Sequence, residues 1–177
     1  MRVVAGALRG RRIEAPPGSD TRPTTDKVRE AVFNALVSRD LIRDARVADL
    51  FAGTGALGIE ALSRGAHHCT FVERDRNVVR ILRGNIEQLG LDGSSRVLAA
   101  DALSQAATID ADIVLADPPY DFDAWPRLLS AVRAPIVVAE AGHRLESLEG
   151  LAELGWETTR SKRYGRTWVT FFERIDR

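Results

Sequence analysis

The chain of 177 residues contains a single cysteine, only two lysines and no long apolar run. One cysteine excludes a disulfide framework within the chain and a cysteine-rich metal site. No segment approaches the ~20 consecutive apolar residues that a membrane helix needs, and the first residues do not resemble a signal peptide. We therefore expect a cytoplasmic globular protein, of a length typical of one domain.

The net charge is zero, so the overall charge does not indicate a nucleic-acid partner. The distribution of charge is more informative. Basic clusters without any acid occupy residues 2–12 and 160–166, whereas residues 97–126 contain six aspartates and neither lysine nor arginine. This pattern favours phosphate at the rim of the protein and a cationic ligand inside it, although solvated surface charge explains either basic cluster equally well.

From residue 46 onward, short apolar runs alternate with helical periodicity, which predicts a parallel sheet with helices on both faces. A final pair of strands around the turn Tyr164-Gly165 predicts an antiparallel edge. Strands are expected at 47–51, 70–73, 96–100, 113–116, 135–139, 156–162 and 167–173, and helices at 56–64 and 75–89.

The first 45 residues are expected to form a small hairpin and a helix that begins at Thr24 or Thr25. The predicted fold is therefore α/β, with one domain over residues 1–177 and a Rossmann-like core over 46–177.

The segment Gly53-Thr54-Gly55-Ala56-Leu57-Gly58 matches the pattern G-x-G-x-x-G, follows a predicted strand and opens a predicted helix. Glycines there let the backbone approach a ligand closely. Glu73 ends the next strand, where a carboxylate can bind both hydroxyls of a ribose. These features fit either a dinucleotide or S-adenosylmethionine.

Three features favour S-adenosylmethionine. Asp49 lies inside the first predicted strand, where it can meet the amino group of a methionine moiety. Asp101 follows the third strand and can accept a hydrogen bond from the adenine amine, while Ala102 offers a backbone N–H to the ring. The acidic stretch also suits a sulfonium and an ammonium better than a pyrophosphate. The alternative is a tight turn without a ligand, in which Asp101 caps a helix.

The segment Asp117-Pro118-Pro119-Tyr120 leaves the carboxyl end of a predicted strand, where open α/β sheets bind their ligands. The Asp117 carboxylate and the Pro118 carbonyl can accept hydrogen bonds from an exocyclic amine and free its lone pair for attack. The prolines fix the backbone that carries this carbonyl, and Tyr120 can stack on a base. A strand-ending turn without catalytic function is the alternative.

Metal chemistry is not expected. Cys69 lies in a strand-like run and is interpreted as a buried structural thiol. His67, His68 and His143 have no paired ligands nearby in the sequence.

These motifs resemble the class I, Rossmann-like methyltransferases. The segments 4–13 and 22–34, the latter with the run Arg-Pro-Thr-Thr-Asp, resemble the RsmD-type family, which methylates N2 of a guanine in small-subunit ribosomal RNA. The resemblance implies S-adenosylmethionine as cofactor and a loop guanine of the 30S particle as target. It implies catalytic roles for Asp117, Pro118, Pro119 and Tyr120. It implies cofactor binding by Asp49, Ala52, Gly53, Gly55, Glu73, Asp101, Ala102 and Thr25.

The arginines of the N-terminal hairpin and of the start of the following helix are expected to bind RNA phosphates: Arg9, Arg11, Arg12, Arg22 and Arg29. Two alternatives remain open. A DNA N6-adenine methyltransferase shares the core motifs but usually carries an inserted recognition domain, for which this chain has no room. A non-catalytic RNA-binding assembly factor would have no physical reason to retain Gly53, Glu73, Asp101 and Asp117. The oligomeric state stays open.

Overall fold

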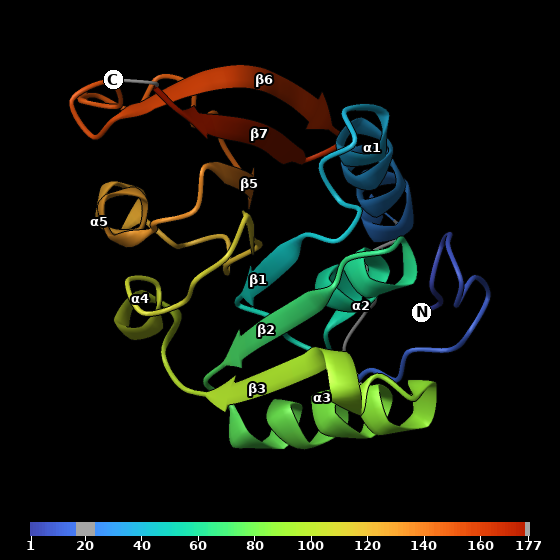
Figure 1. The fold of residues 1–177 in the computed structure, drawn as a ribbon. Helices are drawn as coiled ribbons and strands as arrows, with labels where there is room; N and C mark the ends of the chain where they lie inside the picture. Colours follow the sequence, from blue (N-terminus) through green and yellow to red (C-terminus); the bar gives the residue numbers. More distant parts are fainter. Residues whose placement is uncertain (17–23, 176–177) are drawn as a thin grey trace.

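A computed structural model describes residues 1–16 and 24–175, with the side chains of Thr24 and Thr25 excluded. Figure 1 shows the chain as one sheet flanked by helices. The helices are α1 (Thr24–Ser38), α2 (Ala56–Ser63), α3 (Arg76–Leu89), α4 (Ala102–Gln105) and α5 (Trp125–Ala131), with a 3-10 turn at Asp92–Ser94. The strands are β1 (Arg46–Leu50), β2 (His68–Glu73), β3 (Ser95–Ala99), β4 (Ile113–Ala116), β5 (Ile136–Ala141), β6 (Trp156–Tyr164) and β7 (Thr167–Arg174).

The strands form a single sheet in the order β3-β2-β1-β4-β5-β7-β6. The first five are parallel, and β7 is antiparallel to both β5 and β6. The predicted mixed sheet with a closing antiparallel hairpin is therefore confirmed. The strand order reverses between β1 and β4, which places the ligand-binding crevice of such a sheet at the carboxyl ends of these two strands.

Each face of the sheet has its own core. On one face, α1, α2 and α3 pack on alternate strand residues such as Val47, Phe71 and Leu115. On the other, α4 and α5 pack on their neighbours, such as Leu50 and Val114. This alternation follows from the two-residue period of a strand buried on both sides. Figure 1 shows the two groups of helices on opposite sides of the strands.

The predicted helix boundaries have identifiable causes. Asp75 accepts hydrogen bonds from the backbone N–H groups of Asn77 and Val78 at the start of α3, and Gly90 adopts a left-handed conformation at its end. The predicted apolar stripe of α1 is buried (Val28, Val32, Ala35, Leu36). Helices α4 and α5 escaped prediction because one or two turns are too short for helical periodicity to appear.

The N-terminal hairpin is less regular than expected: an isolated bridge joins Arg2 and Arg12, and a few backbone hydrogen bonds, such as that from the Val3 N–H to the Arg11 carbonyl, cross it. Helix α2 also holds the hairpin in place. Glu60, fully buried, accepts hydrogen bonds from the backbone N–H groups of Val4 and Ala5 at 2.8 and 3.0 Å. Ser63 adds further bonds to the same segment. Within the described part of the chain, no helix is long and apolar enough to cross a membrane.

Candidate active site

Two adjoining cavities open at the carboxyl ends of the central strands. The larger, of about 580 Å³, reaches from Glu73 and Asp101 to the segment after β4. The smaller, of about 240 Å³, lies between Asp49, the glycine loop and the N-terminal segment. Phe51 and Asp117 line both cavities. The predicted cofactor and catalytic motifs therefore meet at one place, where the two cavities join.

The glycine loop combines two different requirements. A Cβ on Gly55 would lie 2.5 Å from the Leu82 side chain, and one on Gly58 would lie 2.3 Å from the Phe71 ring, so both glycines permit close packing of α2. Gly53 differs, because a Cβ there would meet nothing within 4 Å. Its φ of 54° lies in the left-handed region, which favours glycine. The space beside Gly53 is open to the smaller cavity. Gly53 is therefore the glycine that leaves room for a ligand.

Asp49 is 1% exposed and accepts a hydrogen bond of 2.8 Å from the backbone N–H of Gly58. Burial, together with the nearby carboxylates of Asp117 and Glu73, raises the pKa of Asp49 to about 7 despite the lowering effect of the Gly58 bond. A cation in the smaller cavity would stabilise the ionised form. The chemistry of this wall fits the ammonium of a methionine moiety.

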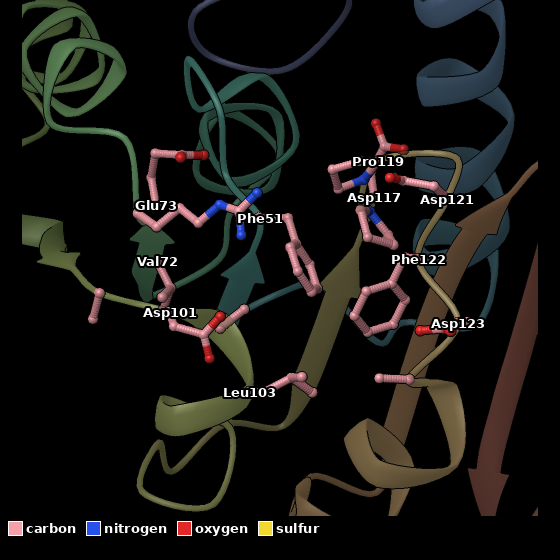
Figure 2. Close-up of a pocket in the computed structure, with 15 residues that line it drawn as sticks. Phe51, Val72, Glu73, Asp101, Leu103, Asp117, Pro119, Asp121, Phe122 and Asp123 are labelled. Atoms are coloured by element: carbon pink, nitrogen blue, oxygen red, sulfur yellow. The ribbon is translucent and has the colours of Figure 1, made fainter.

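Glu73 and Asp101 line the same side of the larger cavity, at the carboxyl ends of β2 and β3 (Figure 2). The two carboxylate oxygens of Glu73 accept hydrogen bonds from the backbone N–H groups of Gly53 and Asp75, at 2.9 and 2.8 Å. Asp101 caps α4 by accepting from the Ser104 N–H at 3.0 Å. Asp101 therefore both caps α4 and lines the cavity wall. Ala102 and Ala52 also line the cavities.

An aromatic pair that the motifs did not reveal shapes the larger cavity. The rings of Phe51 and Phe122 meet edge to face with centroids 5.1 Å apart, and Phe122 packs in the same way on the buried Trp125. Figure 2 shows both rings between the Glu73–Asp101 side and the Asp117 side. Phe51 adopts a positive φ of 69°, which is rare outside glycine and frequent at functional sites. An apolar wall opposite two acids suits a flat ring such as adenine.

The segment Asp117–Tyr120 borders both the cavity and the surface. Asp117, Pro118 and Pro119 line the larger cavity, whereas Tyr120 is 49% exposed. The Tyr120 ring lies over Gly142, where an added Cβ would be 3.0 Å from the ring. Tyr120 therefore lies at the surface, directly after the cavity-lining Pro119 and next to the end of β5.

The role expected for Arg29 is wrong. We expected it to bind RNA phosphates, yet it is only 2% exposed. Its guanidinium donates to the Arg2 carbonyl at 2.7 Å and to Asp26 at 2.8 Å, and it lies 3.5 Å from the buried Glu60. An arginine enclosed in this way joins α1, α2 and the N-terminal segment and is not available to a phosphate.

Of the remaining expected RNA contacts, Arg9, Arg11 and Arg12 are exposed on the N-terminal hairpin. Arg22 lies outside the described residues, and Thr25 lies in the first turn of α1, with a side chain that is likewise not described. Cys69 is buried, as expected, and burial raises the pKa of its thiol well above the usual range. The described residues contain no group of three or more potential metal ligands.

The strand order, the glycine loop and the acids within β1, at the end of β2 and after β3 together define a class I methyltransferase fold. A family model described as conserved hypothetical protein 95 matches residues 1–173, and the chain belongs to that family, the RsmD family of methyltransferases.

Two relatives illustrate the similarity in sequence. The chain is 37% identical to the putative rRNA methyltransferase YlbH of Bacillus subtilis, over 98% of this chain and 99% of that protein. It is 43% identical to the ribosomal RNA small subunit methyltransferase D of Escherichia coli strain K12, over 68% of this chain and 60% of that protein. Among solved structures, the putative methyltransferase yhhF of Escherichia coli superposes with a TM-score of 0.85 at 33% identity, covering 100% of this chain and 99% of the other.

Proposed function

We propose that this protein transfers a methyl group from S-adenosylmethionine to the exocyclic N2 amine of a guanine in small-subunit ribosomal RNA, in the 30S particle. The observation that carries the proposal is the position of Asp117, which lines both cavities at their junction. A group placed there faces the ligand of the cofactor cavities and a base that enters from the surface. The names of the relatives support ribosomal RNA as the substrate, and such a substrate supports a cytoplasmic location.

The lining of the two cavities supports one orientation of the cofactor. Glu73 would bind the ribose, Asp101 and the Ala102 N–H would bind the adenine, and the Phe51–Phe122 wall would cover the ring. Gly53 and Asp49 would then hold the methionine part in the smaller cavity, with Ala52 and Thr25 completing the site and Gly55 contributing through its close packing on Leu82. When bound, S-adenosylmethionine supplies an electrophilic methyl group on a sulfonium.

The protein would activate the amine. An exocyclic amine is a weak nucleophile because its lone pair is delocalised into the base. The Asp117 carboxylate and the Pro118 carbonyl would accept its two hydrogens and draw the nitrogen toward tetrahedral geometry. Pro118 and Pro119 would keep these acceptors fixed, so that little reorganisation is needed. The new N–C bond forms as the S–C bond breaks, and the proton leaves to Asp117 or to water.

Tyr120 would stack on the extruded guanine at the entrance, and an unpaired loop base costs least to extrude. The exposed arginines of the hairpin would bind phosphates. Replacing Arg11 and Arg12 together with glutamine should weaken RNA binding and reduce its dependence on salt while leaving cofactor affinity unchanged. Unchanged RNA affinity would show that these two residues do not contact the RNA.

The proposal is tested by incubating the protein with methyl-labelled S-adenosylmethionine and, in parallel, 30S particles, deproteinised ribosomal RNA or DNA. We expect label in the RNA of the 30S particles, at one guanine N2 after nuclease digestion and mass mapping. Label in DNA adenine would support the alternative of a DNA N6-adenine methyltransferase. Failure to bind the cofactor in a calorimeter would support the alternative of a non-catalytic RNA-binding assembly factor. Asp117→Asn should abolish transfer but keep cofactor binding, whereas Asp92→Asn, at an exposed turn, should behave as wild type.

A further inference from the structure

The outer face of α3 carries a row of arginines that none of the roles above uses. Arg76, Arg80 and Arg83 follow at spacings of four and three residues, so they lie on one side of the helix. All three are exposed, and none forms a salt bridge with another described residue. The helical rise spreads them over about 10 Å. Arg74, just before the helix, lines the larger cavity, so the row begins at the candidate active site.

The row is continuous with the N-terminal hairpin. The Arg11 guanidinium donates a hydrogen bond of 3.1 Å to the carbonyl of Gln88, in the last turn of α3. Figure 1 shows the N-terminal segment running beside this helix. The hairpin, which also carries the exposed Arg9 and Arg12, therefore adjoins the C-terminal end of the arginine row. We call this set, Arg9, Arg11, Arg12, Arg76, Arg80 and Arg83, the α3 basic face.

Gly84 lies within α3, one turn after Arg80 and next to Arg83. A Cβ on Gly84 would meet nothing within 4 Å, so no packing contact in the fold requires glycine there. Glycine inside a helix is less stable than alanine. Its one local effect is to leave bare backbone among the arginines, where a partner can approach more closely than a side chain would allow.

The composition of the α3 basic face favours a phosphate backbone over a protein surface. Protein interfaces usually centre on apolar or aromatic anchors. Among the described residues, the large apolar side chains that are exposed are Val37, Tyr120 and Ile175, none of them on α3. The acids nearby are Asp75, which caps the helix, Glu87 in its last turn, and Glu14, whose backbone is hydrogen-bonded to the Asn85 side chain of α3. Arginine forks without acid partners suit phosphate oxygens.

We propose that the α3 basic face binds the phosphate backbone of the RNA substrate, with one phosphate seated over Gly84 between Arg80 and Arg83. The RNA then runs from the base held at Asp117, past Arg74 at the cavity wall, and along α3 to the hairpin. This inference rests on the proposed function, because it names the surface that holds the substrate of the same site.

The first test replaces Arg76, Arg80 and Arg83 together with glutamine and measures binding to deproteinised small-subunit ribosomal RNA over a range of salt concentrations. The slope of log affinity against log salt should become shallower by about 2 to 3, and affinity at 0.1 M salt should fall by roughly 10- to 100-fold. Cofactor affinity should not change. The matched control replaces Arg43, Arg127 and Arg133, which are exposed elsewhere, and should keep the wild-type slope despite the same loss of charge.

The second test is Gly84→Ala. It should raise the midpoint of thermal unfolding by about 1–4 °C, yet weaken RNA binding by about three- to tenfold. Because stability rises while binding falls, misfolding cannot account for that result.

Three outcomes would overturn the inference: a triple variant with the wild-type slope, a Gly84→Ala variant with wild-type RNA affinity, or a loss of affinity confined to assembled particles. The last would identify a ribosomal protein as the partner. A wild-type protein that neither binds nor methylates RNA would instead refute the proposed function.

Discussion

The carboxylate of Glu73 accepts a hydrogen bond from the backbone N–H of Gly53 at 2.9 Å, and so joins the loop after β1 to the end of β2. Its second oxygen accepts from the Asp75 N–H at 2.8 Å. Glu73 thus shapes the glycine loop before any ligand arrives, and the remaining lone pairs of the same oxygens stay able to accept ribose hydroxyls. We therefore propose that this one side chain couples the geometry of the loop to the binding of the cofactor.

Glu73→Gln tests this coupling. The amide places an N–H donor against one of two backbone donors, so one hydrogen bond is lost and the loop is pushed from its position. We expect a loss of about 1–2 kcal/mol in unfolding free energy and roughly 10- to 100-fold weaker cofactor binding in a calorimeter. Glu153→Gln, at an exposed position, is the matched control. Full cofactor affinity in Glu73→Gln would exclude Glu73 from the binding site.

Asp49 predicts a dependence of cofactor binding on pH. Its pKa of about 7, raised chiefly by burial, means that it ionises only as pH rises from 6 to 8. A ligand ammonium prefers the ionised form, so cofactor affinity should increase over that interval in the wild type. Asp49→Asn should bind more weakly and lose this dependence. Calorimetric titrations at pH 6, 7 and 8 measure this dependence. If cofactor affinity changed equally with pH in both proteins, the prediction would be contradicted.

The same residue predicts an opposite effect on stability. A carboxyl whose folded pKa is raised stabilises the folded state at low pH and loses that contribution as pH rises toward the folded pKa. Asp49→Asn keeps an oxygen that can accept from the Gly58 N–H and has no charge to bury. At pH 8 the unfolding free energy of the variant should therefore exceed that of the wild type by about 1–3 kcal/mol, as measured by denaturant titration. The difference should shrink toward pH 4. A variant that is less stable at pH 8 would contradict this explanation.

Sequence patterns predicted the parts of this fold that depend on local chemistry. Apolar runs located the strands, and Asp75 and Gly90 ended α3 as their residue types suggest. Contacts between distant segments were not visible in the same way. Arg29 stands beside Val28 and Val32 on α1, but its partner Glu60 lies on another helix, so its residue type alone suggested a phosphate contact. The Phe51–Phe122 wall was missed for the same reason, since it joins two loops 71 positions apart.

Arg29→Met tests the structural role assigned to that residue. Methionine fills similar volume but leaves the Arg2 carbonyl without its donor and removes a charge beside the buried Glu60, which keeps Arg64 as a partner. We expect a loss of about 2–3 kcal/mol in unfolding free energy and an unchanged salt dependence of RNA binding. The exposed Arg12→Met should show the reverse pattern. A reduced salt slope in Arg29→Met, with stability intact, would restore Arg29 to the RNA interface.

Gly142 and Tyr120 provide a test of the entrance to the site. A methyl group on Gly142 would lie 3.0 Å from the Tyr120 ring, closer than carbon atoms normally pack, so Gly142→Ala should displace the ring from its position at the end of β5. If Tyr120 stacks on the target base, this displacement should raise the KM for RNA by about 5- to 50-fold, a part of the ~1–3 kcal/mol that such stacking contributes. Cofactor affinity should stay unchanged, because neither residue lines the cofactor cavities.

Tyr120→Phe keeps the ring and should retain the wild-type KM, whereas Tyr120→Ala should raise the KM at least as much as Gly142→Ala does. Steady-state methylation of 30S particles separates these cases, and a Tyr120→Ala variant with the wild-type KM would show that the ring does not contact the substrate.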